Sequence, residues 1–124
     1  MTDANFIFDV QNKIAHQGLT VEKKYIPGEL PHLLVRNPVT GIEVFVELQD
    51  AKSYGELPLA TAIQLKKAKE RHSNILLVSL SNVSSILGDA LNNMGISFLV
   101  RPSAEVVFQK INEIATTTQA QVIH

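Results

Sequence analysis

The stretch that most constrains the fold runs from residue 31 to residue 50, with the sequence PHLLVRNPVTGIEVFVELQD. Two apolar runs, HLLVR and IEVFVEL, flank NPVTG, whose asparagine, proline and glycine are typical of a turn. In the second run the side chains alternate between two faces, with Ile42, Val44, Val46 and Leu48 on one and Glu43, Phe45 and Glu47 on the other. The pattern predicts a β-hairpin with one fully apolar face and a second face that carries Glu47.

The rest of the chain divides into helical and extended segments. Apolar residues recur at helical spacing in segments 5–17, 59–72, 83–94 and 104–114, and the last of these follows Ser103, a candidate N-cap. In segment 59–72 the apolar side is predicted to comprise Leu59, Ala62 and Ile63, with Leu65 as a candidate fourth member. Segment 19–26 has the alternation of a half-buried strand, whereas segments 74–81 and 96–100 are continuous apolar runs typical of strands covered on both faces.

The resulting order is α-β-β-β-α-β-α-β-α, which predicts one α/β domain over residues 1–116 and a flexible C-terminal tail over residues 117–124. The first three strands form an antiparallel meander. The later strands are added through right-handed crossovers. We expect a three-layer α/β/α sandwich around a mixed sheet.

Composition narrows the classes of function. Hydrophobic residues make up 45% of the chain and the formal net charge is -1, so nucleic-acid binding would need a local basic patch. The chain has no cysteine, which excludes disulfides, thiolate metal sites and cysteine nucleophiles. The sequence shows neither a signal peptide nor a membrane-spanning apolar run, and we expect a cytoplasmic protein with no membrane partner.

A helix, a three-stranded meander, a helix and a further strand, with an acid near the end of the third strand, resemble the PD-(D/E)XK nuclease superfamily over roughly residues 5–101. The resemblance implies a restriction-endonuclease-like fold. It also implies Mg²⁺ or Mn²⁺ as cofactor and DNA as substrate. Hydrolysis of a phosphodiester needs its negative charge neutralised and a water activated, which metal ions held by carboxylates can do.

Matched to the motif, Pro31-His32 falls where the family has Pro-Asp, and Glu47-Leu48-Gln49 falls where it has acid-x-Lys. The resemblance assigns Glu47 and His32 as metal ligands and Gln49 as the residue that orients water. Imidazole is a poor ligand for Mg²⁺, and a neutral amide contributes no charge, so both departures put cleavage in doubt. Carboxylates that would compensate are Asp9, which the resemblance assigns as a further metal ligand, Glu29 and Asp50.

The second predicted helix adds two further expectations. Gln64 falls where RecB-like relatives carry a supporting glutamine, although Ala68 stands in place of the tyrosine of their QxxxY pattern. The same helix carries candidate phosphate contacts at Lys66, Lys67, Lys69 and Arg71. No aromatic residue interleaves with these lysines, so the sequence shows no platform for base stacking.

Three functions remain open. The first is a nuclease-like domain with impaired catalysis that acts on nucleic acid or as a protein-interaction module. The second is an active metal-dependent DNA endonuclease or resolvase that uses Glu47. The third is a pseudo-receiver signalling module, suggested by NILLVSLSN and by Arg101-Pro102, which stands where receiver domains have Lys-Pro. A receiver requires an all-parallel sheet. A DNA or protein partner and a homodimer are compatible with all of these observations.

Overall fold

The computed structural model describes the backbone of residues 3–24, 32–51 and 55–123, and side chains within residues 6–23, 32–51 and 55–116. The elements are α1 (Asp3–His16), β1 (Thr20–Lys24), β2 (His32–Arg36), β3 (Glu43–Gln49), α2 (Ala60–Lys69), β4 (Ile75–Ser79), α3 (Ser85–Asn93), β5 (Ser97–Val100) and α4 (Ala104–Ile123). This order is the one predicted from the sequence.

The strands form one open, mixed sheet in the order β1-β2-β3-β4-β5. β1 pairs with β2 and β2 with β3 in antiparallel fashion, whereas β3–β4 and β4–β5 are parallel pairs. The predicted meander and the later parallel strands are therefore confirmed. The antiparallel pairs contradict the all-parallel sheet that the receiver alternative requires.

The predicted hairpin at NPVTG is present, and Asn37 fixes its turn. The Asn37 side chain accepts a hydrogen bond from the Val39 N–H at 2.9 Å, and the Asn37 carbonyl accepts one from the Gly41 N–H at 2.8 Å. Gly41 has a φ of 77°, a left-handed conformation that glycine adopts without steric cost. The turn sets the register in which Leu33 pairs with Val46.

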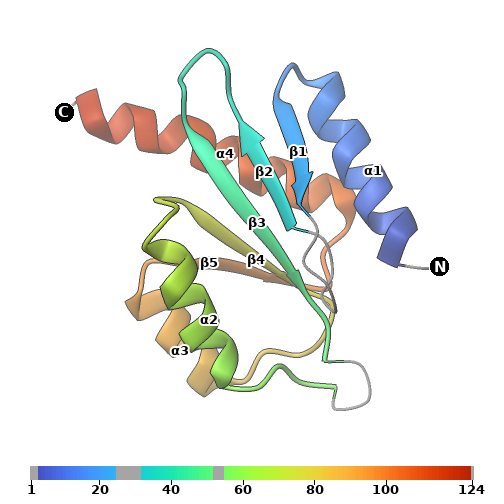
Figure 1. Ribbon diagram of the computed structural model, residues 1–124, viewed down its shortest axis with the longest axis vertical. Helices are drawn as coiled ribbons and strands as arrows, with labels where there is room; N and C mark the ends of the chain where they lie inside the picture. Colours follow the sequence, from blue (N-terminus) through green and yellow to red (C-terminus); the bar gives the residue numbers. More distant parts are fainter. Residues whose placement is uncertain (1–2, 25–31, 52–54, 124) are drawn as a thin grey trace.

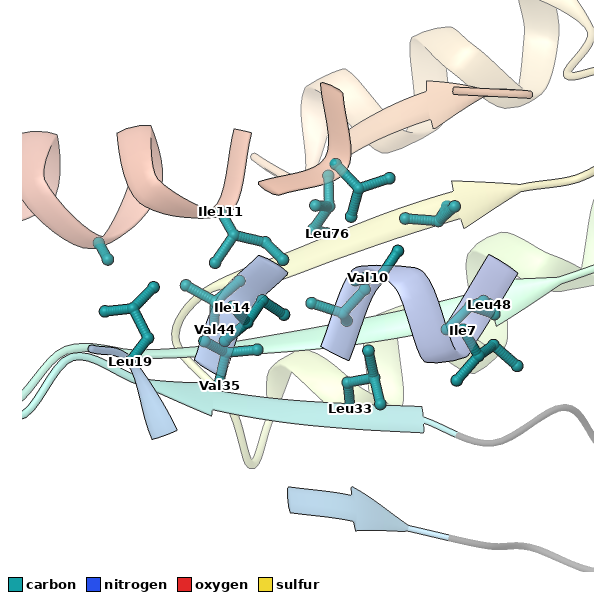
Figure 2. Close-up of a cluster of buried hydrophobic side chains, with 14 residues drawn as sticks. Ile7, Val10, Ile14, Leu19, Leu33, Val35, Val44, Leu48, Leu76 and Ile111 are labelled. Atoms are coloured by element: carbon teal, nitrogen blue, oxygen red, sulfur yellow. The ribbon is translucent and has the colours of Figure 1, made fainter. Parts of the chain in front are cut away.

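Helices cover both faces of the sheet, which makes the three layers (Figure 1). On one face, side chains of α1 and α4 pack against alternate residues of β2, β3 and β4 (Figure 2). On the other face, α2 and α3 pack on Phe45, Ile75 and Leu77. Because Phe45 and Glu47 alternate with Val44, Val46 and Leu48, Glu47 lies on the α2 side of β3.

The buried side of α2 differs from the predicted one. Leu59 and Ile63 are 54% and 62% exposed, whereas Leu65 is fully buried and Thr61 is 2% exposed. The helix begins at Ala60 and turns Thr61, Leu65 and Ala68 toward the sheet at i, i+4 and i+7. The prediction is confirmed for Leu65 and for Ala62, which packs on the same cluster, and is wrong for Leu59 and Ile63. It missed Thr61 because a threonine occupies the buried position in the first turn and the apolar pattern does not count it.

The last helix begins as predicted, because the Ser103 hydroxyl accepts a hydrogen bond from the Val106 N–H at 3.2 Å. It continues through Ile123, so residues 117–123 have a helical backbone beyond the predicted end of the domain. Their flexibility stays a prediction. Within the described residues, no helix is both long enough and apolar enough to cross a membrane.

Candidate functional site

Glu47 and His32 lie side by side on neighbouring strands. Leu33 pairs with Val46 in the antiparallel β2–β3 ladder. His32, the residue before Leu33, therefore lies next to Glu47, the residue after Val46, on the α2 side of the sheet. The His32 Nδ1 lies 3.4 Å from the Glu47 Oε1, and both side chains are buried. A buried carboxylate is costly unless it is paired, and the imidazole supplies that partner. The structure thus brings together the two residues that the sequence placed at the motif positions.

Gln49 contacts the other oxygen of the same carboxylate. Its Nε2 donates a hydrogen bond to the Glu47 Oε2 at 3.1 Å, as the two-residue spacing on one strand allows. The Glu47 carboxylate is therefore held from two sides, by an imidazole and by an amide.

A pocket of about 250 Å³ opens above this group, between strands β2 and β3 and helix α2. Its walls are made by His32, Phe45, Glu47, Gln64, Lys67, Ala68, Arg71 and His72. Gln64, Lys67 and Arg71 stand at i, i+3 and i+7, so they follow one side of α2 and of the turn after it. The predicted residues Gln64, Lys67 and Arg71 are thereby brought to the same place as Glu47.

The other two predicted phosphate contacts lie elsewhere on α2. Lys66 is exposed and does not line the pocket. Lys69 extends toward Gly95, which follows the end of α3. Its Nζ lies 3.5 Å from the position that a Cβ atom would occupy if one were added to Gly95. The spacing on the helix explains the difference, because Lys66 and Lys69 project from the side opposite to Lys67 and Arg71.

Among the described residues, the additional carboxylates Asp9 and Asp50 do not line the pocket above Glu47. Asp9 belongs to α1, which packs on the other face of the sheet. The Asp50 Oδ1 accepts a hydrogen bond from the Ser81 hydroxyl at 2.9 Å, and Ser81 Oγ in turn accepts one from the Ala51 N–H at 2.8 Å. Asp50 thus joins the ends of β3 and β4. Glu29 and Pro31 lie outside the described residues.

Two aromatic side chains that were not among the predicted site residues, Phe45 and His72, complete the pocket. The rings of Phe45 and His72 are stacked, with centroids 4.3 Å apart and an angle of 3° between their planes. His32 packs on Phe45 as well, at 5.3 Å and 52°. The Phe45 N–H donates to the Asn74 carbonyl at 2.9 Å, which holds the turn after α2 against β3. The alternation of side chains along β3 predicted Phe45 on the same face as Glu47. No local pattern in the sequence indicates that the turn after α2 brings His72 against the Phe45 ring.

The described charged side chains that line the pocket are one carboxylate and two cations. Glu47 is the single carboxylate among the described residues that line it, and Lys67 and Arg71 are exposed cations at its wall. Across the described part of the chain, no group of three or more His, Asp or Glu is arranged to hold a metal ion. Two cations that face the same cavity repel Mg²⁺ and attract phosphate.

No protein-family model, curated protein or solved structure matches the chain.

Proposed function

We propose that this chain is a nuclease-like domain of the PD-(D/E)XK type that binds nucleic acid and is impaired in metal-dependent cleavage. Support for the family comes from the element order α1-β1-β2-β3-α2-β4 and from the antiparallel meander that carries an acid near the end of β3. The resemblance to the family rests on the order of the elements and on a short motif, so the proposed function depends on the chemistry of the residues in the site.

The observation that carries the proposal is the buried contact between His32 Nδ1 and Glu47 Oε1. At this position the family motif calls for a second carboxylate, which would share a metal ion with Glu47. Mg²⁺ is a hard cation that prefers oxygen ligands, and a site with one carboxylate, one imidazole and one amide offers it too little negative charge. The imidazole occupies the partner position beside Glu47 instead.

The retained function is phosphate binding. Lys67 and Arg71 line the pocket from one side of α2, and Gln64 lines it as a neutral hydrogen-bonding group. A guanidinium and an ammonium group at this spacing form charge-assisted hydrogen bonds to phosphate oxygens. Nucleic acid is the polymer that presents such phosphates in series.

The test measures binding and cleavage with the same purified chain. Labelled single-stranded, double-stranded and branched DNA, and single-stranded RNA, are incubated with the protein in Mg²⁺, Mn²⁺ or EDTA. We expect binding that weakens with salt in all three conditions and no cleavage in any. The double variant Lys67→Ala/Arg71→Ala should weaken binding at least about tenfold, as the loss of two phosphate contacts implies.

Lys66→Ala is the matched control, since it removes a lysine from the same helix on the side away from the pocket. Binding that is lost equally in the control and in the double variant contradicts the assignment of the pocket. Absence of salt-dependent binding to any nucleic acid overturns the proposed function as a whole.

An active metal-dependent nuclease is the second candidate, favoured by the hydrogen bond from Gln49 to Glu47 and by Gln64 in the same pocket. In that case Glu47 holds the ion with His32, Gln49 orients the water, and Gln64 supports them. A carboxylate and an imidazole together suit Mn²⁺ better than Mg²⁺.

This candidate predicts turnover by the unmodified chain in Mn²⁺ that Glu47→Ala abolishes and that EDTA prevents. Activity that survives in Glu47→Ala does not come from this site.

A further inference from the structure

The pocket combines two kinds of wall that a nucleotide uses at once. One wall is aromatic and consists of the stacked rings of Phe45 and His72. The other is cationic and consists of Lys67 and Arg71. Arg71 immediately precedes His72 in the chain, so the two walls meet at the turn after α2. A ligand that matches both walls carries an anionic group, which contacts the cations, next to a flat ring, which packs on the aromatic side chains.

The depth of the aromatic wall limits which form of nucleic acid can use it. Phe45 is 8% exposed and sits on the sheet at the bottom of the pocket, with α2 rising beside it. In a duplex the phosphates lie outside and the bases are stacked and paired inside. A duplex therefore reaches Lys67 and Arg71 but brings no base to Phe45 and His72 unless a nucleotide is flipped out, which costs free energy. A single strand presents its bases without that cost.

We propose that the pocket binds an unpaired nucleotide of a single-stranded nucleic acid. The base packs on His72, whose ring is held in place by stacking on the buried Phe45, and an adjoining phosphate contacts Lys67 and Arg71. Histidine rings and phenylalanine rings both serve as stacking surfaces for bases in proteins that bind single strands. This inference rests on the proposed function and narrows its ligand from nucleic acid in general to unpaired strands.

The amount of charge supports a strand over a free nucleotide. Lys67 and Arg71 are exposed at the wall of the pocket, one helical turn apart. Neighbouring phosphates of a strand can reach these cations, whereas a mononucleotide brings phosphate to one point. The strand therefore gains electrostatic free energy that the mononucleotide lacks.

The experiment compares affinities by fluorescence anisotropy for one labelled oligonucleotide, as DNA and as RNA, in single-stranded form and as a blunt duplex. We expect the single strand to bind more tightly. His72→Ala should reduce single-strand affinity by roughly 5- to 160-fold, the range that follows from losing one base–aromatic contact, and should leave duplex affinity nearly unchanged. His72→Phe retains a flat ring and should keep the single-strand preference.

Ser73→Ala is the control, because Ser73 is the exposed next residue and does not line the pocket. Circular dichroism of each variant checks that the fold is intact, and His72→Phe carries the test if His72→Ala does not fold. A mononucleotide added as competitor tests whether the pocket binds a nucleotide within a strand or a free nucleotide, since both carry a base and a phosphate. Displacement of the strand by mononucleotide at equal nucleotide concentration overturns the assignment to a strand.

The outcomes separate this inference from the proposed function. Equal affinity for strand and duplex, or equal effects of His72→Ala and Ser73→Ala, overturns the inference while salt-dependent binding through Lys67 and Arg71 still supports the proposed function. No binding to any nucleic acid overturns both.

Discussion

At the scale of single residues, Glu47 is held by two different kinds of group. One oxygen faces the His32 imidazole and the other accepts a hydrogen bond from Gln49. Burial makes this arrangement sensitive, because removing one partner leaves a polar group in a medium that does not solvate it. Loss of either partner of the His32–Glu47 contact should therefore destabilise the folded state.

The His32–Glu47 contact predicts strong coupling in a double-mutant cycle. His32→Leu leaves the Glu47 carboxylate buried without its imidazole and should destabilise the fold by about 3–5 kcal/mol. Glu47→Leu leaves a buried imidazole without its acid and should destabilise it by about 1–3 kcal/mol. The double variant should recover part of that loss, with a coupling free energy of about 1–3 kcal/mol. Urea denaturation of the four proteins measures it. Free-energy changes that add within about 0.5 kcal/mol would show that the two groups do not interact.

At the scale of elements, one side of α2 packs on the sheet and another side lines the pocket. Thr61 and Leu65 fix it to the sheet, whereas Gln64, Lys67 and Arg71 face the pocket. The packing side thereby determines which basic residues reach the site. This is why the structure selects Lys67 and Arg71 from four basic candidates that the sequence left equivalent.

The orientation of α2 predicts unequal costs for two aliphatic residues that are two positions apart. Leu65→Ala removes a fully buried side chain and should destabilise the fold by about 2–5 kcal/mol. Ile63→Ala removes a side chain that is 62% exposed and should change stability by about 0.5 kcal/mol at most. Thermal or urea unfolding compares them directly. Similar losses in both variants would mean that the helix is rotated away from the orientation in which Leu65 faces the sheet.

At the scale of the whole molecule, the net charge of -1 provides no general attraction for nucleic acid. In the proposed function, binding comes from the local pair Lys67 and Arg71, and it should involve few released counterions. A strongly basic protein would instead make many phosphate contacts and depend steeply on salt.

The salt dependence of binding follows from this local charge. With two phosphate contacts to a single strand, the slope of log affinity against log salt should be about -1.4, and Lys67→Ala should reduce its magnitude by about 0.7. Anisotropy titrations at several salt concentrations give both slopes. A slope that is several times steeper, or one that Lys67→Ala leaves unchanged, would place the phosphate contacts elsewhere on the surface.

The sequence by itself determined the order of the elements, the hairpin at NPVTG and the side of β3 that carries Glu47. These features depend on turn residues and on the period of apolar residues, and both are local properties of the chain. The pairing of His32 with Glu47 was also within reach of the sequence, because turn length sets the register between adjacent strands.

Only the tertiary structure decided which side of α2 faces the sheet, and with it the choice of Lys67 and Arg71. It also stacked His72 on Phe45, although these two residues are far apart in the sequence. It placed Asp9, which belongs to α1, on the face of the sheet opposite to Glu47. The physical reason is the same in each case. The rotation of a helix and the path of a turn are set by how the whole core packs, and packing joins residues that local patterns treat independently.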